Sequence, residues 1–260
     1  MQHLPRLDTV TSSFAESFDA PVLDPERWVD HYLPQWTTAE RSRARYDLPG
    51  PGQPPGLRLR IDADQLDWRP EDAPLRVSNL QTAVFSGPLR STRGTHRHRH
   101  DGLTVRTEVS LQLLWAPRSG QVDVTVTASR DRGCMLAAWL VGTEHLDEDD
   151  SGEVCLFEID SDAVKTGSTT ARVGIKAHHD PRSSDEMEVV VPVGAGQAHT
   201  WSAHWSPDGV VIACEQAVVF ASAQVLSYPL QLMVDLFEIG PRNGADTYPK
   251  TAVVHAVTGS

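Results

Sequence analysis

The segment SGEVCLFEID, residues 151–160, has the apolar content of a buried strand but carries three carboxylates. Its apolar residues are β-branched, aromatic or bulky, which is typical of strands. An unpaired carboxylate is costly to bury, so Glu153, Glu158 and Asp160 would not be expected in a core strand without a use. The segment therefore predicts a strand with one functional face.

The spacing of the two glutamates predicts a local irregularity in this strand. Successive side chains of a strand point to opposite faces, so Glu153 and Glu158, five positions apart, would face opposite ways in a regular strand. One β-bulge between them adds a residue and restores the phase. Glu153, Cys155 and Glu158 then share a face, with Asp160 next along it. Such a pair matches a retaining glycosidase, whose carboxyl groups lie about 5–5.5 Å apart.

A second interpretation of these residues requires no chemistry. Glutamates on strands also occur along solvated edges, unpaired or paired with Lys and Arg. A short motif stays a hypothesis until its context agrees, so the choice depends on the rest of the chain.

Composition favours an all-β chain. The 260 residues suffice for one large or two ordinary domains, and 40% are hydrophobic. Short apolar runs recur between Gly, Pro, Asp and Ser, and the 18 Gly and 18 Pro indicate many turns. No internal repeat or linker is visible. We therefore expect a single domain over residues 1–260, with residues 1–13 as a loose lead-in.

About a dozen strands are predicted from apolar alternation or continuous apolar runs. They cover residues 14–19, 57–61, 78–86, 103–116, 122–127, 135–142, 151–160, 172–177, 188–193, 200–205, 210–214, 217–220, 230–237 and 252–257. A hairpin is expected at Ser119-Gly120, joining 103–116 to 122–127. The number and spacing of the strands predict a sandwich or barrel. A sandwich of two antiparallel sheets offers a concave face, where aromatic rings and carboxylates would form a sugar cleft.

Charge and cysteine content exclude several classes of function. The net charge of −12 argues against a nucleic-acid binder and against a protein of anionic membranes. Three cysteines are an odd number, and we expect buried free thiols rather than a disulfide framework. The first residues, MQHLPRLDTVTSS, contain no apolar signal-peptide core. We expect a cytoplasmic protein, or a secreted one if a leader has been removed.

One basic run, RSTRGTHRHRH over residues 90–100, places His96, His98 and His100 at alternate positions. No Cys or carboxylate lies at ligand spacing within the run, so we expect a loop or an arm over a cleft rather than a metal site. Its arginines would also suit an anionic or hydroxyl-rich ligand, and the sequence does not separate these uses.

Five segments, in order along the chain, resemble glycoside hydrolase family 16. The resemblance spans nearly the whole chain. Residues 152–158, GEVCLFE, resemble the family's bulged signature Glu-x-Asp-x-x-Glu except at Cys155. The other segments are FAESFD with LDPERW (14–19 and 23–28), AAWL (137–140), HTWSAHWSPD (199–208) and YPLQL (228–232).

The resemblance implies a concanavalin A-like jelly roll, the fold of a β-sandwich lectin or glucanase. It also implies a retaining endo-glycoside hydrolase that cleaves a β-linked polysaccharide by double displacement. The polysaccharide would be a β-1,3- or mixed-linkage glucan, or a galactan. Carried over from the family pattern, Glu153 would be the nucleophile and Glu158 the general acid/base. Two neighbouring carboxylates push their pKa values apart, which suits these two roles.

The resemblance also implies supporting residues. His178 resembles a cleft histidine of the family, although His179 serves equally if the register differs. Trp115 and Trp139 are candidate stacking platforms, with core packing as the alternative for each, and Trp205 is assigned to the core.

Two positions depart from the family pattern. Cys155 stands where the family has an Asp that tunes the nucleophile, and a thiol is a weak donor and a poor acceptor. We expect Asp160 or a water to substitute for it. His255 replaces an Asp that helps to hold a structural Ca²⁺, so we expect no metal and no cofactor. The alternative to a hydrolase is a non-catalytic, lectin-like carbohydrate-binding protein on the same fold.

Overall fold

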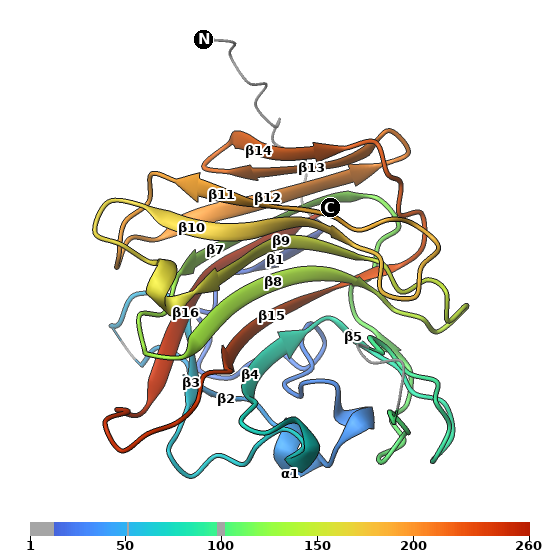
Figure 1. The fold of residues 1–260 in the computed structure, drawn as a ribbon, viewed down its shortest axis with the longest axis horizontal. Helices are drawn as coiled ribbons and strands as arrows, with labels where there is room; N and C mark the ends of the chain where they lie inside the picture. The colour runs from blue at the N-terminus through green and yellow to red at the C-terminus, as the bar shows by residue number, and fades with distance from the viewer. Residues whose placement is uncertain (1–12, 51, 98–101) are drawn as a thin grey trace.

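The computed structural model describes residues 13–50, 52–97 and 102–260. Residues 1–12 of the expected lead-in, and His98 and His100 of the basic run, lie outside these ranges. Two antiparallel sheets are stacked face to face, as predicted (Figure 1). We call the sheet that faces the viewer in Figure 1 the front sheet and the other the back sheet.

The front sheet has six strands, all paired antiparallel. In spatial order they are β11 (Asp185–Val191), β10 (Thr169–Lys176), β9 (Glu153–Asp160), β8 (Cys134–Gly142), β15 (Leu230–Glu238) and β4 (Arg76–Gln81). The back sheet has eight strands, seven of them in one row with β1 beside β16. They are β14 (Ala217–Ser222), β13 (Gly209–Cys214), β12 (His199–Ser206), β7 (Gly120–Thr127), β16 (Lys250–Gly259), β3 (Leu57–Ile61), β2 (Arg45–Asp47) and β1 (Phe14–Glu16).

The remaining elements are short. A two-stranded ladder pairs β5 (Ala83–Val84) with β6 (Gln112–Leu113). The helical turns are η1 (Pro34–Trp36), α1 (Ala39–Ser42), η2 (Pro70–Asp72) and η3 (Ser161–Ala163). No helix in the described ranges has the length and apolar character needed to cross a bilayer.

The main core fills the space between the sheets. Alternation along β15 illustrates how the sequence builds it, since Leu230, Leu232, Val234 and Leu236 all point into this core and are fully buried. Each such side chain contributes about 1.5–3 kcal/mol through removal of its surface from water. The residues between them therefore face the opposite side of the front sheet.

A second apolar cluster covers part of that outer, front face. Loop residues Tyr32, Trp36 and Trp68 pack there against the sheet residues Trp139 and Phe237. The ring centroids of Tyr32 and Phe237 lie 5.4 Å apart, and those of Trp139 and Phe237 lie 5.5 Å apart. The wholly apolar strand β8 is thus buried on both faces, which explains why its sequence does not alternate.

The predicted bulge lies in β9. Glu158 pairs with Ala137 and Phe157 with Ala138, but Trp139 pairs with Cys155, so Leu156 is an extra residue opposite β8. Leu156 and Phe157 both belong to the core between the sheets. The bulge therefore returns Glu158 to the face that carries Glu153 and Cys155.

One predicted hairpin is wrong. Residues 103–116 form only the short strand β6, and β7 pairs with β12 and β16 instead. The apolar residues of this stretch have another use, because Leu103 and Val105 are buried in the outer cluster. Val105 exchanges backbone hydrogen bonds with Arg90 and Ser91, so this segment is a loop that packs over the front sheet.

Candidate active site

Three side chains of β9 meet on the front face. One ligand atom each from Glu153, Cys155 and Glu158 lies within 4.8 Å of the other two. Glu153 is 1% exposed and Glu158 is 7% exposed. Burial of two carboxylates this close together requires counter-charges, because each would otherwise lose its solvation without compensation.

The neighbouring strand supplies these charges. Lys176 of β10 pairs in register with Glu153, and Arg172 with Glu158. Lys176 Nζ lies 3.2 Å from Glu153 Oε1 and also contacts Glu158 Oε1. Arg172 Nε donates to Glu158 Oε2 at 2.9 Å, and its Nη1 donates to Asp160 Oδ2 at 2.5 Å.

These contacts determine the charge of the nucleophile candidate. Burial raises the pKa of Glu153, but the Lys176 ammonium and a hydrogen bond from His178 outweigh it and lower the pKa to about 2. Burial in turn lowers the pKa of Lys176, and the neighbouring Glu153 and Glu158 outweigh it and raise that pKa above its usual value. At neutral pH the group contains an ionised Glu153 and a charged Lys176.

His178 is the histidine that reaches the pair. Its Nε2 lies 2.9 Å from Glu153 Oε2 and must carry the proton, because an ionised carboxylate only accepts. His179 points elsewhere, with Nε2 2.7 Å from the Arg97 carbonyl oxygen, so His178 rather than His179 is the cleft residue.

Buried hydrogen bonds hold the loop that carries His178. Tyr228 Oη donates to Asp180 Oδ2 at 2.6 Å and accepts from the Gly152 backbone N–H at 2.8 Å. A Cβ atom on Gly152 would lie 2.3 Å from the Tyr228 hydroxyl, so only glycine fits directly before Glu153. The His179 backbone N–H also donates to Ser151 Oγ, which ties the loop to the start of β9.

A second loop brings His96 over the site. The His96 backbone N–H donates to Glu144 Oε1 at 2.6 Å, and Thr95 Oγ1 donates to the Thr143 carbonyl oxygen at 2.9 Å. The His96 ring is stacked 6.1 Å from Trp139 and lies edge-on 4.9 Å from His178. The basic run thus contributes to the site through a loop, as expected.

Three residues around the site have left-handed backbones although none is glycine. The φ angles of His96, Glu144 and His178 are 55°, 54° and 52°. Such conformations cost of order 1–3 kcal/mol each and persist where surrounding contacts impose them, often at functional sites. Here they orient two imidazoles toward Glu153.

The two tryptophans proposed as stacking platforms have different positions. Trp139 lies on the front face in register with Cys155, is 6% exposed, and has Lys176 Nζ 5.3 Å above its ring. Trp115 is 8% exposed and lies in the core, where its ring centroid is 5.4 Å from Phe14 and 6.2 Å from Trp205. Trp115 is therefore a core residue, and the prediction that its ring stacks against a sugar is wrong.

Cys155 is a buried free thiol, as expected, whereas Asp160 does not have the expected role. The Cys155 thiol donates to the Arg172 carbonyl oxygen at 3.6 Å, and burial raises its pKa well above the usual range, so it is a neutral thiol. Asp160 reaches Arg172 rather than Glu153. It therefore acts on Glu158 through Arg172 and does not substitute for the missing Asp beside the nucleophile.

Lys176 and Arg172 were missed at the sequence level. Their signal was the strand that follows β9, where Arg172, Gly174 and Lys176 alternate and so share one face. A bulged partner strand makes the register between the two strands hard to predict, so the pairing of each cation with its carboxylate was not available from the spacing alone.

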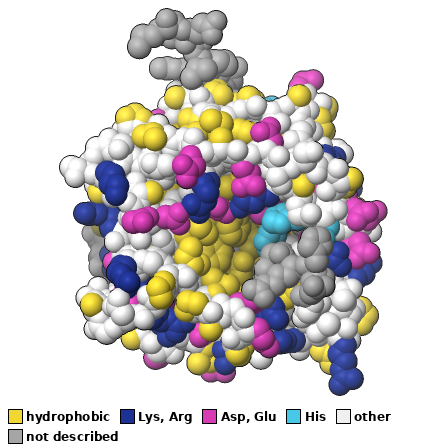
Figure 2. All heavy atoms as spheres, in the orientation of Figure 1, with side chains coloured by type: hydrophobic (Ala, Val, Ile, Leu, Met, Phe, Trp, Pro, Cys, Tyr) yellow, Lys and Arg dark blue, Asp and Glu magenta, His cyan; other side chains and the backbone are white. Residues whose placement is uncertain are grey.

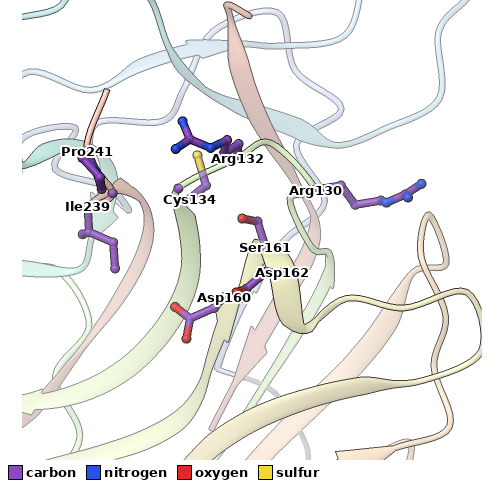
Figure 3. Close-up of a pocket in the computed structure, with 10 residues that line it drawn as sticks. Arg130, Arg132, Cys134, Asp160, Ser161, Asp162, Ile239 and Pro241 are labelled. Carbon is purple, nitrogen blue, oxygen red and sulfur yellow. The ribbon is translucent and has the colours of Figure 1, made fainter. Parts of the chain in front are cut away.

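The front face of the molecule is hollowed (Figure 2). Figure 2 shows an apolar floor bordered on one side by acidic and basic side chains and on another by histidines. A separate pocket of about 550 Å³ opens where β8 begins and β9 and β15 end. Asp160 and Asp162 line it together with Cys134, while Arg130 extends away from the others (Figure 3). Asp160 lines this pocket and also contacts Arg172, the partner of Glu158, so the pocket adjoins the Glu158 end of the site.

Among the residues that the structure describes, two groups have donor atoms close enough to share a metal ion. They are His96, Glu153 and His178, and Glu153, Cys155 and Glu158. A dication in either group would face the Lys176 ammonium, which already contacts Glu153 and Glu158. Lys176 therefore already compensates negative charge of the two carboxylates, without a metal ion. His255, at the position considered for calcium, shares a 2.8 Å hydrogen bond with Thr127 Oγ1.

Comparisons with known proteins place this geometry in context. No protein-family model matches the chain, and no curated protein matches it. Among solved structures, the chain is similar to a GlcNAcα1-4Gal-releasing endo-β-galactosidase from Clostridium perfringens, with 20% identity and a TM-score of 0.80. That match covers 96% of this chain but 61% of the galactosidase chain.

Two glucanases are similar over their full length. The catalytic domain of an endo-1,3-β-glucanase (laminarinase) from Thermotoga petrophila RKU-1 has 12% identity and a TM-score of 0.63, covering 97% of this chain and 98% of its own. A non-specific endo-β-1,3(4)-glucanase from glycoside hydrolase family 16 has 13% identity and a TM-score of 0.65, covering 99% of each chain. At these identities the likeness concerns the fold. The predicted resemblance to family 16 and its jelly roll is confirmed at that level.

Proposed function

We propose that this chain is a retaining endo-glycoside hydrolase that cleaves a β-linked polysaccharide, with Glu153 as nucleophile and Glu158 as general acid/base. The observation that carries the proposal is the pair of buried carboxylates on one face of β9, with atoms within 4.8 Å of each other. A retaining pair lies about 5–5.5 Å apart, whereas an inverting pair needs about 6.5–9.5 Å to admit a water.

In this mechanism, Glu158 gives its proton to the leaving glycosidic oxygen while Glu153 attacks the anomeric carbon from the other side. The C–O bond to the leaving sugar breaks as the bond to Glu153 forms. Glu158, now a carboxylate, then takes a proton from water, and the resulting hydroxide displaces Glu153 with retained configuration. His178 keeps Glu153 oriented, and Arg172 does the same for Glu158.

The floor of the site supports a sugar ligand. Trp139 offers an aromatic ring directly beside the pair. Within the described residues, the two polar atoms of the buried Gln231 side chain have no hydrogen-bond partner. In the buried Asp235, Oδ1 accepts a hydrogen bond from Asn79, but Oδ2 has no partner. Both side chains alternate onto the front face of β15, and buried polar groups of this kind require partners such as sugar hydroxyls or water. Burial also raises the pKa of Asp235 well above its usual value, so it can donate a hydrogen bond.

The printed names of the similar structures guide the choice of substrates to test. Candidates are a β-1,3- or mixed-linkage glucan and a galactan, and the higher TM-score of the endo-β-galactosidase, 0.80 against 0.63, favours β-galactosides as first substrates to test. No requirement for a cofactor follows from this mechanism. The expected partner is a polysaccharide or oligosaccharide.

The alternative is a lectin-like protein that binds sugars without turnover. It is favoured by one observation, the Lys176 ammonium that lies between the two carboxylates. A panel of β-glucans, galactans and mucin-type glycans, with product analysis, separates the two functions. Turnover that Glu153→Gln abolishes while sugar binding persists supports the hydrolase. Binding without any turnover in the parent supports the lectin, and absence of both rejects each proposal.

A further inference from the structure

Lys176 occupies an unusual position for a hydrolase site. Its Nζ lies 3.2 Å from Glu153 Oε1, contacts Glu158 Oε1 and sits 5.3 Å from the centroid of the Trp139 ring. The other oxygen of each carboxylate is also taken, Glu153 Oε2 by His178 and Glu158 Oε2 by Arg172. Each of the four oxygens therefore lies at ion-pair or hydrogen-bond distance from a side chain, and Glu153 Oε1 faces the Lys176 ammonium without accepting a hydrogen bond.

The position of the ammonium conflicts with the first chemical step. An oxygen of Glu153 must be free to reach the anomeric carbon, and that carbon must lie between the two carboxyl groups above the aromatic floor. This is the volume in which the ammonium lies. The transition state of glycoside cleavage carries positive charge on the sugar ring, so the resident cation has the same sign as the species that the site must stabilise.

We propose that Lys176 is a resident counter-ion that holds the sugar's place between Glu153 and Glu158 and must be displaced when a substrate binds. Its charge favours the ionised form of Glu153 in the empty site, and its departure removes that stabilisation while the two carboxyl groups stay close together. Identification of the displacing ligand as a sugar rests on the proposed function, whereas the counter-ion role does not.

The surroundings of Lys176 support this role. The titratable and charged groups nearby are Glu153, Cys155, Glu158 and Asp160 on β9, Arg172 on its own strand, Glu186 on β11, Asp235 on β15, and His96, His178 and Tyr32 from the loops. Arg172 remains on Glu158 and Asp160 if Lys176 leaves, so it does not replace the charge beside Glu153. Two carboxylates within 4.8 Å then compete for ionisation and share a proton.

The counter-ion role is tested without turnover. Lys176→Met is compared with the parent and with Lys165→Met, in which an exposed lysine that donates only to the Asp162 backbone is removed. The side-chain carboxyl carbons of ¹³C-labelled glutamate are titrated by NMR from pH 3 to 9, and Glu153→Gln identifies the Glu153 signal. We expect proton uptake by the pair to move upward by at least about one pH unit in Lys176→Met only, since a charge partner within 4–6 Å shifts a carboxyl pKa by that amount. Superimposed titrations of parent and variant overturn the proposal.

The place-holding role is tested by binding. Calorimetry with a neutral β-1,3-linked gluco-oligosaccharide and a neutral β-1,4-linked galacto-oligosaccharide should give at least severalfold tighter binding to Lys176→Met than to the parent. Equal or weaker binding contradicts displacement. If no sugar binds either protein while the carboxyl titration still shifts, the proposed function fails and the counter-ion stands. Lys176→Gln, which keeps a donor without the charge, replaces the Met variant if thermal unfolding shows that the latter does not fold.

Discussion

The hydroxyl of Tyr228 should determine how firmly His178 is held against Glu153, and Tyr228→Phe tests this. The variant keeps the buried ring but removes the donor to Asp180 Oδ2 and the acceptor of the Gly152 N–H. Each buried group left without a partner costs about 1–3 kcal/mol, and the Arg182 contact with Asp180 Oδ2 compensates part of one loss. We expect the free energy of unfolding to fall by about 2–4 kcal/mol.

For a chain of this size, 1 kcal/mol corresponds to about 2–4 °C in melting temperature, so the midpoint should fall by roughly 5–15 °C. Urea unfolding followed by tryptophan fluorescence measures the free energy directly. Tyr46→Phe is the matched control, because its half-buried hydroxyl makes one long contact, 3.5 Å to Asp30 Oδ2, and should cost less than about 1 kcal/mol. kcat/KM should fall in Tyr228→Phe and stay unchanged in the control. Equal stability of the two variants would refute the reasoning.

Three further outcomes follow from the positions of single side chains. Trp115→Phe should lower the free energy of unfolding by about 1–3 kcal/mol and leave KM unchanged, because Trp115 is a core residue. Trp139→Phe should raise KM with little effect on the free energy of unfolding. The reverse pattern would restore Trp115 as the sugar platform. Burial raises the pKa of Glu144 from 4.5 to about 8, although the backbone N–H groups of His96 and Arg97 lower it. Because the pKa of Glu144 is raised in the folded protein, this group contributes stability that is present below pH 4.5 and is lost as the pH rises through 8. Glu144→Gln should therefore flatten the decline in the free energy of unfolding between pH 5 and 8. Parallel curves for parent and variant argue against this. Cys155, whose pKa burial raises well above its usual range, should resist iodoacetamide at pH 8 until the protein unfolds, and rapid labelling of the native protein would be inconsistent with a neutral buried thiol.

The fold was predictable because most strands carry their signal locally. Alternation at Leu57–Ile61 and the continuous apolar run of residues 135–142 correspond to β3 and β8. The bulge was predictable for a chemical reason, since two glutamates five positions apart can share a face only if one residue is added. The strand predicted over residues 103–116 is wrong, because the alternation there reflects packing of Leu103 and Val105 on the outer face of the front sheet.

From residue spacing alone, the site was predictable only where one strand supplies it, whereas His178 and Trp139 were expected from the family resemblance. Glu153, Cys155 and Glu158 come from β9, but their charge partners come from β10 and depend on a register that the bulge shifts. The contact of Glu144 with the His96 backbone joins residues 48 positions apart, and nothing in either segment indicates the other. Trp115 and Trp139 both follow apolar residues in the sequence. Only the three-dimensional structure shows that Trp115 lies in the core between the sheets and Trp139 on the outer face.

The central claim is that Glu153 forms a covalent bond with the sugar. The most direct measurement is the mass of the protein after incubation with a 2-deoxy-2-fluoro glycoside that carries an activated leaving group and the sugar of the identified substrate, followed by peptide mapping. We predict one added glycosyl mass on the peptide that contains Glu153, and none in Glu153→Gln. Turnover of the natural substrate with no adduct on Glu153, or with inverted configuration of the released product, would contradict the account.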